Sequence, residues 1–394
     1  MPIYSLLDTD LYKFSMQLAV LQNFAGAEAV YRFKDRNKTV YNDAFIKGLE
    51  EDIDVLSQIS LRDVELRYIR DHLAFLAKPD YLSYLNNYRF DPNQIKFGLD
   101  SEGCLELEIF GNWEEAILWE IPLMACISER YFLHCDTNWT VSNQYELAEN
   151  KALRLSYNNC TYADFSTRRR RNLTSQETFV KAALSVAKKH PGFVGTSNVH
   201  LARIFDTKAI GTMAHEWFMG ISGLVGLRHA NREGLWRWAN TYEGNLGIAL
   251  PDTFGTQAFF EDFDGQLARM YDGVRHDSGD PLLFGDKVID HYRKHNIKCL
   301  SKTIVFSDSL NVQKALEIQK YFAGRINVSY GIGTHFSNDF QNSPPLNIVI
   351  KLWSINGIPV VKLSDEPGKI QGDRDACRVA NWTFFGTPLD LKVT

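Results

Sequence analysis

One histidine of the chain lies in a setting that favours chemistry. His215 belongs to the stretch GTMAHEW, where it follows small residues and precedes Glu216, which could orient it. A lone histidine is most often a core residue, but a neutral imidazole can also bind a metal or act as a nucleophile. The stretch lacks the H-E-x-x-H spacing of zinc proteases, so a metal ligand is the weakest interpretation. Because Gly211 and Thr212 precede it at a predicted strand end, we interpret His215 as a reacting group.

A second stretch, VRHDSGDP, concentrates charge in a short loop. It places Arg275, Asp277 and Asp280 within six residues, and the Ser-Gly pair between the two acids favours a tight turn. Two carboxylates beside an arginine suit a ribose diol together with a phosphate or Mg²⁺. The same residues could form a capped turn ahead of a helix, so both interpretations stay open.

A third stretch, SYGIGTHFSND, combines two glycines and a hydroxyl directly after a strand-like run. Gly331 and Gly333 would let backbone N–H groups approach a phosphate, and a helix that begins near Thr334 would add its dipole. A lone G-x-G is a weak signal. Its predicted place in the last strand-to-helix turn, where barrels commonly hold phosphate, favours a phosphate site.

Four consecutive arginines occupy residues 168–171 in the stretch STRRRRN. The flanking residues place this run at the entrance of a helix. A charge run is commonly a solvated face, and a local anion site is the alternative. The sequence alone leaves both open.

The composition narrows the class of protein. With 394 residues, 45% of them hydrophobic, the chain can bury one large core or two ordinary ones. The net charge of -5 argues against a nucleic-acid partner, and no apolar run is long enough to cross a bilayer. Six scattered cysteines without a C-x-x-C pair indicate neither a disulfide framework nor a zinc knuckle. We therefore expect a cytoplasmic protein without nucleic-acid or membrane partners.

The elements that must position these stretches change in kind along the chain. Residues 1–140 mix helical spacing, as over 61–76, with a half-buried strand pattern over 105–109. From about residue 150, short apolar runs, polar loops and amphipathic helices alternate, which indicates βα units on a parallel sheet. We predict an N-terminal α/β domain over 1–140, completed by residues after about 345, and a catalytic α/β barrel over 141–345.

Six stretches together resemble the nicotinate phosphoribosyltransferase family of the bacterial and fungal type, a family of type II phosphoribosyltransferases. In chain order they are DTDLYKFSM, DFSTRRR, GTSNVHLAR, GTMAHEW, VRHDSGDP and SYGIGTHFSND. The resemblance implies an irregular (β/α) barrel packed on an N-terminal α/β domain, in a homodimer whose active sites take residues from both subunits. It also implies ATP-coupled transfer of phosphoribosyl from phosphoribosyl pyrophosphate (PRPP) to nicotinate, which gives nicotinate mononucleotide and pyrophosphate for NAD biosynthesis.

The resemblance assigns roles to several of these side chains. It implies that ATP phosphorylates His215, that Phe165 stacks on the pyridine ring, and that Tyr12 of the partner chain covers the other ring face. Arg168 resembles the arginine that meets the substrate's acyl group. Asn198 stands where enzymes of the nicotinamide branch carry an aspartate, and a neutral residue there favours the nicotinate carboxylate.

The same resemblance implies a PRPP site. Asp277 would stabilise a ribosyl oxocarbenium ion, while Mg²⁺ would neutralise the departing pyrophosphate. We predict no metal site built from the protein's own residues. The residues implied to bind PRPP are Arg275, Asp277, Gly331, Gly333 and Thr334, with Thr253 and Ser309 as further neighbours.

Three other functions stay open at this point. Asn198 argues against nicotinamide phosphoribosyl transfer, whereas quinolinate transfer could use the spare arginines for its second carboxylate. A PRPP- or nicotinate-binding homologue without turnover would have no use for a phosphorylatable His215. A substrate panel with PRPP, with and without ATP, separates these functions.

Overall fold

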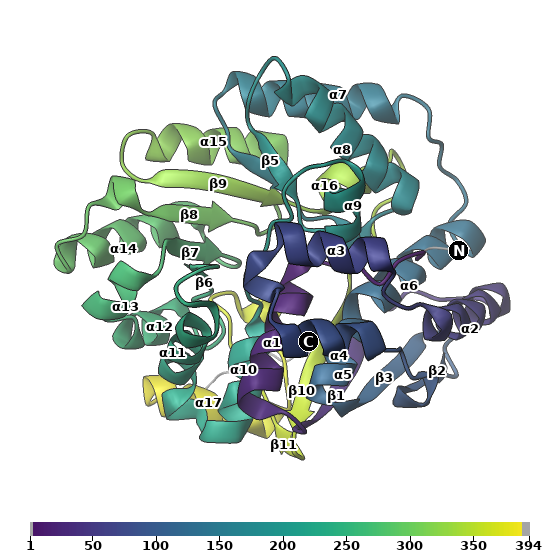
Figure 1. Cartoon of the computed structure of the whole chain (residues 1–394), viewed down its shortest axis with the longest axis horizontal. Coiled ribbons are helices and arrows are strands. Elements are labelled where there is room, and N and C mark those ends of the chain that lie inside the picture. The colour runs from purple at the N-terminus through teal and green to yellow at the C-terminus, as the bar shows by residue number, and fades with distance from the viewer. Residues whose placement is uncertain (1–2, 388–394) are drawn as a thin grey trace.

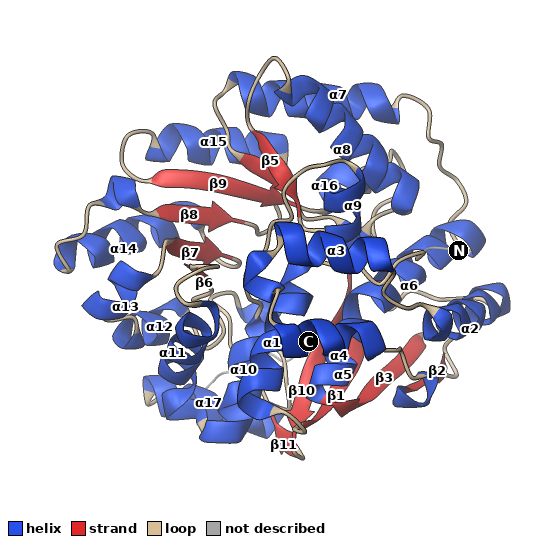
Figure 2. Ribbon diagram, viewed as in Figure 1, coloured by secondary structure: helices blue, strands red, loops and turns tan. Residues whose placement is uncertain are grey.

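Two sheets organise the protein, whose computed structural model describes residues 3–387 (Figures 1 and 2). One sheet is antiparallel, in the order β11-β10-β1-β3-β2, and the other is parallel, in the order β5-β4-β9-β8-β7-β6. The strands are β1 Glu28–Asp35, β2 Ile95–Leu99, β3 Leu105–Asn112, β4 Tyr162–Asp164, β5 Phe193–Thr196, β6 Ile248–Ala249, β7 Gly273–His276, β8 Thr303–Phe306, β9 Asn327–Ile332, β10 Ile348–Ile355 and β11 Ile358–Pro359.

Helices surround both sheets, and Figure 2 shows α14 and α15 on the outer side of the parallel strands. None of the helices within residues 3–387 is long and apolar enough to span a membrane. The α-helices are α1 Leu11–Phe24, α2 Asp43–Gln58, α3 Asp63–His72, α4 Pro79–Asn87, α5 Trp113–Ala116, α6 Glu120–His134, α7 Gln144–Tyr157, α8 Leu173–Ala187, α9 Val199–Ile204, α10 His215–Val225, α11 Ala230–Tyr242, α12 Thr256–Asp262, α13 Gly265–Met270, α14 Pro281–Lys294, α15 Val312–Phe322, α16 Thr334–Ser337 and α17 Arg374–Phe385.

Both ends of the chain contribute to the antiparallel sheet. β10 pairs with β1, so that Lys351 lies opposite Arg32, and β1 pairs with β3 on its other side. In β3 the residues Leu105, Leu107 and Ile109 are buried, which confirms the alternation expected over 105–109. The domain boundaries near residues 140 and 345 stay a prediction.

The parallel sheet aligns the carboxyl ends of its strands at one edge. Its outermost strands, β5 and β6, form no ladder with each other in the described part of the chain. One extended segment bridges them, because Ile210 N donates to Thr196 O at 2.8 Å and Thr212 Oγ1 donates to Ile248 O at 3.0 Å. The mixed α/β class is confirmed, and this bridging segment stands where a regular barrel would have a further paired strand.

The prediction of a strand directly before His215 is wrong. Only Ala209 pairs with β5, in a single bridge, and α10 begins at His215 itself. The reason is the close approach of α1: a Cβ at Gly211 would lie 3.1 Å from Tyr12 N. The segment bonds to this helix instead, since Ser15 Oγ donates to Thr212 O at 2.6 Å.

Helix α1 connects the two halves of the molecule. Leu11 N donates to Ser197 O at 2.8 Å on the parallel-sheet side, while Gln17 Nε2 donates to Glu114 O at 2.7 Å near the antiparallel sheet. Residues 13–20 are all buried, as expected for a helix enclosed by protein. This helix thus carries its first residues to the edge where the strands of the parallel sheet end.

Candidate active site

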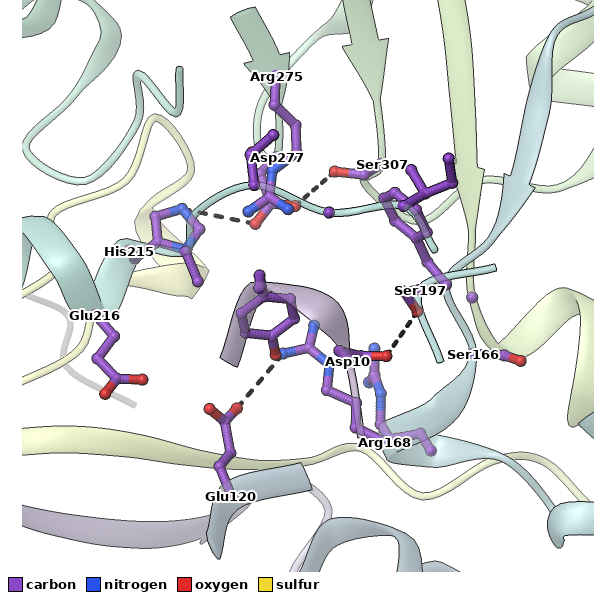
Figure 3. Close-up of a pocket in the computed structure, with 18 of the residues that line it drawn as sticks. Asp10, Glu120, Ser166, Arg168, Ser197, His215, Glu216, Arg275, Asp277 and Ser307 are labelled. Atoms are coloured by element: carbon purple, nitrogen blue, oxygen red, sulfur yellow. Dashed lines mark hydrogen bonds and ion pairs between the residues drawn. The ribbon is translucent and has the colours of Figure 1, made fainter. Parts of the chain in front are cut away.

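A cavity of about 170 Å³ lies at the carboxyl edge of the parallel sheet, against α1 and β10 (Figure 3). The parallel strands bring their terminal loops together there, although these loops are far apart in sequence. The predicted site residues that line it are Tyr12, Phe165, Arg168, His215, Arg275, Asp277, Gly333 and Thr334.

His215 is the first residue of α10 and is 4% exposed. Its Nε2 lies 2.8 Å from Asp252 Oδ1 and 3.6 Å from Asp277 Oδ2. Burial and the positive charge of Lys362 lower the pKa of His215 to about 4, although both carboxylates oppose this. The imidazole is therefore neutral at pH 7.

Asp252 orients His215, and the sequence analysis did not single it out. Burial would raise the pKa of Asp252, but Lys362 and His215 hold it well below its usual range. Its second oxygen accepts from Ser278 Oγ at 2.6 Å. The available signal was a carboxylate at the strand end in GIALPDTFGTQ, directly before the predicted residue Thr253.

Glu216 points away from His215 (Figure 3). Its carboxylate accepts hydrogen bonds from Tyr31 OH and from Trp113 Nε1, the latter at 2.8 Å. It also pairs with the fully buried Lys13, whose Nζ lies 2.5 Å away. The role suggested from the sequence, an orienting partner for His215, therefore belongs to Asp252.

Asp277 and Arg275 come from the end of β7 and both line the cavity (Figure 3). Asp277 Oδ1 accepts from Ser307 Oγ at 2.9 Å. Burial alone would raise the pKa of Asp277, but Arg275, His215 and Lys362 hold it below its usual range. The Arg275 side chain makes no hydrogen bond or ion pair with any residue from 3 to 387, and its Nε is buried. Its guanidinium is therefore available to an anion.

The first two arginines of the run line the cavity. Arg168 Nη1 lies 3.8 Å from Glu120 Oε1, a loose pair that leaves the guanidinium fork open. Arg169 makes no side-chain hydrogen bond or ion pair among the described residues, and its burial together with the charge of Arg168 lowers its pKa to about 10. Both suit carboxylate or phosphate groups.

The last two arginines are structural. Arg170 is fully buried, and its Nη1 and Nη2 donate to the two carboxylate oxygens of Asp8, each at 2.8 Å. Arg171 is also fully buried, with its guanidinium carbon 3.4 Å from the ring centroid of Phe132, and it donates to Ser343 Oγ at 2.6 Å. The solvated interpretation of the run is wrong because protein encloses these two side chains completely.

Phe165 follows β4, and its ring packs on the backbone of β9. A Cβ at Gly331 would lie 2.2 Å from that ring, so only glycine leaves space for it. Gly331 itself does not line the cavity, whereas Gly333 and Thr334 do. The contact that the structure shows for Gly331 is therefore with the Phe165 ring.

Tyr12 lines the cavity of its own chain, whereas the resemblance implied that a partner chain supplies it. The physical reason is the docking of α1: Leu11 is hydrogen-bonded to Ser197, and Lys13 is paired with Glu216. These flanking contacts fix Tyr12 at the cavity within one chain. Which chain's Tyr12 covers the pyridine ring in a homodimer stays a prediction.

Three other predicted residues lie outside the cavity lining. Asn198 donates to Asp8 Oδ1 at 2.6 Å and caps α9, so its side chain is bonded within the protein. Thr253 is fully buried, and its Oγ1 has no hydrogen-bond partner in the described chain. Ser309 is exposed and donates to Asp308 at 3.1 Å. These three placements offer no direct contact with a ligand in the cavity.

Two polar residues that are close in sequence to predicted site residues also line the cavity. Ser197 precedes Asn198, and its hydroxyl donates to Asp10 Oδ1 at 2.6 Å (Figure 3). Asp10 belongs to the stretch DTDLYKFSM, two residues before Tyr12. Burial raises the pKa of Asp10.

A protein-held dication does not fit this site. His215, Asp252 and Asp277 bring ligand atoms within 4.8 Å of one another. However, the Lys362 ammonium lies 3.1 Å from Asp252 Oδ2 and 4.0 Å from Asp277 Oδ2. Its positive charge, together with that of Arg275 near Asp277, offsets the two carboxylates and would repel a metal ion.

Lys351 on β10 adds an unpredicted cation to the cavity wall. Burial lowers the pKa of Lys351 to about 8, with Arg168 adding to this effect and Glu120 opposing it. It makes no ion pair with the residues that the structure describes. A lysine within the apolar run IVIKLW was the available signal.

The fold and the cavity define an α/β enzyme that acts on anionic, phosphate-bearing substrates. Arg169, Arg275 and Lys351 present positive charge without a hydrogen-bonded or ion-paired side chain among residues 3–387, Gly333 lies at a strand end, and His215 is a neutral, oriented imidazole. Such groups receive phosphates and carboxylates, and an imidazole in this state can react with a phosphoryl group.

Comparison with known proteins identifies the family. The model of the nicotinate phosphoribosyltransferase (NAPRTase) family matches residues 160–387, and the model of its N-terminal domain matches residues 7–128. The chain therefore belongs to the nicotinate phosphoribosyltransferase family.

Relatives of nearly full length agree with this. The nicotinate phosphoribosyltransferase of Methanosarcina acetivorans is 46% identical over 98% of this chain and 100% of its own. Nicotinate phosphoribosyltransferase 2 of Pseudomonas aeruginosa is 41% identical over 94% of this chain and 93% of its own. The crystal structure of the nicotinate phosphoribosyltransferase from Porphyromonas gingivalis superposes with a TM-score of 0.93 at 34% identity, covering 97% of this chain and 99% of that one.

Proposed function

We propose that this enzyme, which phosphoribosylates nicotinate in NAD biosynthesis, couples the transfer to ATP through a phosphohistidine at His215. The observation that supports the coupling is the state of the imidazole: neutral, buried and bonded to Asp252 beside the cavity. The Asp252 carboxylate is ionised and can only accept, so Nε2 carries the proton. The lone pair is then on Nδ1, which makes no hydrogen bond within the described chain.

The phosphoryl step follows from this tautomer. Nδ1 attacks the γ-phosphorus of ATP, an N–P bond forms, the bond to the bridging oxygen breaks, and ADP leaves. The ring then carries a proton on Nε2 and a positive charge. Asp252 Oδ1 accepts a hydrogen bond from this Nε2–H, with 2.8 Å between the nitrogen and the oxygen, and its negative charge stabilises the charged ring.

Nicotinate binding is assigned to the aromatic and basic side chains of the cavity. Phe165 and Tyr12 offer rings for stacking on the pyridine. The Arg168 fork offers two parallel donors to the carboxylate. Because Asn198 is bonded to Asp8, we assign the choice of nicotinate over nicotinamide to Arg168.

Ribosyl transfer is assigned to the groups at the ends of β7 and β9. The ionised Asp277 would stabilise an oxocarbenium ion, so no covalent nucleophile is needed at the ribose carbon. Arg275, Arg169 and the backbone at Gly333 would receive phosphate groups. Mg²⁺ would enter with the pyrophosphate of PRPP, since Lys362 and Arg275 offset the charges of Asp252 and Asp277.

A labelling experiment tests the phosphohistidine. His215→Ala should abolish acid-labile labelling from γ-labelled ATP and ATP stimulation of transfer, while slow transfer persists at high PRPP. His291→Ala is the matched control, because His291 is also buried, and its Nε2 donates to the backbone oxygen of Phe263, far along the chain from His215. Undiminished labelling of His215→Ala would contradict the proposal.

The homodimer and the cytoplasmic location are also proposals. All six cysteines are free thiols, which suits a reducing compartment. Since Tyr12 and Asp277 line one cavity of one chain, mixing Tyr12→Ala with Asp277→Asn chains should restore no activity. Recovered activity after subunit exchange would show that Tyr12 serves the partner's site.

A further inference from the structure

One buried cation, Lys362, lies next to the Asp252 carboxylate that orients His215. Lys362 follows β11, and its side chain is 5% exposed. Its backbone is fixed at both sides: Lys362 N donates to Gln371 O at 2.9 Å, and Leu363 N donates to Thr253 O at 2.8 Å. The lysine is thus anchored directly to the loop that carries Asp252.

The ammonium of Lys362 contacts the oxygen of Asp252 that His215 does not use. Asp252 Oδ1 faces His215 Nε2 at 2.8 Å, whereas Oδ2 lies 3.1 Å from Lys362 Nζ and accepts from Ser278 Oγ at 2.6 Å. Both carboxylate oxygens are therefore occupied. The plane of the carboxylate, and with it the orientation of the imidazole, is held from both sides.

The charges around His215 depend on this contact. Asp252, Asp277 and Lys362 are the charged groups that act on the imidazole, and Arg275 in turn acts on Asp277. A buried carboxylate beside a histidine ordinarily favours the imidazolium. With Lys362 in place, the charge of Asp252 is balanced, so a proton gains little by moving onto the ring.

We propose that Lys362 is a positioning residue that, through Asp252, keeps His215 a neutral imidazole with its proton on Nε2 and its lone pair on Nδ1. The proposal deepens the phosphohistidine assignment and rests on it for its functional meaning. Its structural content, the protonation state of one histidine, can be measured without ATP.

Nitrogen NMR on protein containing 15N-labelled histidine tests the proposal. In the parent protein His215 should remain the neutral Nε2–H tautomer from pH 6 to 9. In Lys362→Met, which keeps the aliphatic stem without the charge, the pKa of His215 should rise from about 4 to about 5–7, because an opposing charge is lost. Lys362→Arg keeps the charge and should keep the neutral tautomer.

A matched control separates this effect from the general loss of a buried lysine. Lys302 is 7% exposed and, within the part of the chain that the structure describes, its ammonium bonds only to the backbone oxygens of Arg269 and Tyr271, so Lys302→Met should leave the His215 signals unchanged. In parallel, phosphorylation of Lys362→Met by γ-labelled ATP should fall at pH 6, where the imidazolium competes, by about twofold for a pKa of 6 and about tenfold for a pKa of 7, and recover at pH 8.5.

Two results would overturn the proposal. One is a Lys362→Met protein whose His215 tautomer and titration equal those of the parent. The other is available even if that variant does not fold: a parent His215 that titrates near its ordinary pKa of about 6.5. If the NMR results are as expected but His215→Ala is still labelled by ATP, the phosphohistidine fails and the role of Lys362 stands.

Discussion

Arg168 and Arg169 face an open cavity, whereas Arg170 and Arg171, the next two residues, are enclosed by protein. The backbone explains the division: a 3-10 turn over Thr167–Arg169 ends at Arg170, where the chain becomes extended. The turn directs the first pair to the cavity, and the extended chain carries the second pair inward. The same residue type thus serves recognition in one half of the run and stability in the other.

A similar division separates Tyr12 from Lys13. Tyr12 lines the cavity, while the ammonium of Lys13 is fully buried between Glu120 and Glu216, at 2.6 and 2.5 Å. In both motifs, one residue lines the cavity and a neighbouring residue stabilises the fold. A variant can therefore lose activity through either half, and stability measurements are needed to tell the two causes apart.

The largest effect is expected from Arg170→Ala. Removing one partner of a buried ion pair leaves Asp8 uncompensated and typically costs about 3–5 kcal/mol of unfolding free energy. Urea denaturation would measure it, with Arg70→Ala as the control because the Arg70–Asp71 pair is exposed. If the Arg170→Ala protein were as stable as the parent, the distinction between cavity-lining and structural arginines in the run would be wrong.

Arg168→Ala should show the opposite pattern. We expect kcat/KM for nicotinate to fall by about 30- to 1000-fold, which corresponds to roughly 2–4 kcal/mol for an unpaired carboxylate, with the denaturation midpoint unchanged. Arg168→Lys should recover only part of the loss, because an ammonium lacks the guanidinium fork. Equal losses for nicotinate and nicotinamide would argue against a contact with the carboxylate.

Gly331→Ala should have a smaller effect, confined to the binding of nicotinate. The new Cβ would lie 2.2 Å from the Phe165 ring and displace it, so the KM for nicotinate should rise about two- to tenfold as stacking worth roughly 0.5–1.5 kcal/mol is lost. Gly98→Ala is the control, since nothing lies within 4 Å of its added Cβ. A rise in the KM for PRPP alone would instead support the predicted phosphate cradle at Gly331.

The smallest effect concerns pH. With a pKa of about 8, Lys351 is charged at pH 7 and mostly neutral at pH 9, so its attraction for anions is present below pH 8 and lost above it. The KM for the anionic substrates should rise several-fold over this range in the parent and stay flat in Lys351→Met. His215, with a pKa of about 4, remains neutral throughout and cannot produce this change.

Local patterns predicted the βα rhythm, and together with the family resemblance they identified eight of the residues that line the cavity. Arg275, Asp277 and Gly333 were found because polar and glycine residues at strand ends meet at one sheet edge. Asp252 and Lys362 were missed because their role depends on a contact between residues 110 positions apart, which no spacing in either stretch reveals.

The arginine run shows a second limit of sequence reasoning. Arg170 and Arg171 have the same local pattern as Arg168, and their burial depends on Asp8 and Ser343, which are distant in the chain. Asn198 was placed in the pocket by motif position, yet its amide is bonded to that same Asp8. Both outcomes were set by tertiary partners.

The position of α1 has a consequence for how the chain is made. Lys13 is paired with Glu216, 203 residues further along, so the first helix leaves the ribosome long before this partner. At a synthesis rate of about 5–20 residues per second, that interval is about 10–40 seconds. Throughout it, the helix can pack on segments that emerge earlier, such as those of Tyr81, Glu114 and Glu120, but the side that α10 and α11 cover in the folded protein stays open. Nascent chains shorter than about 220 residues should therefore bind chaperones through this helix and release them once α10 has emerged.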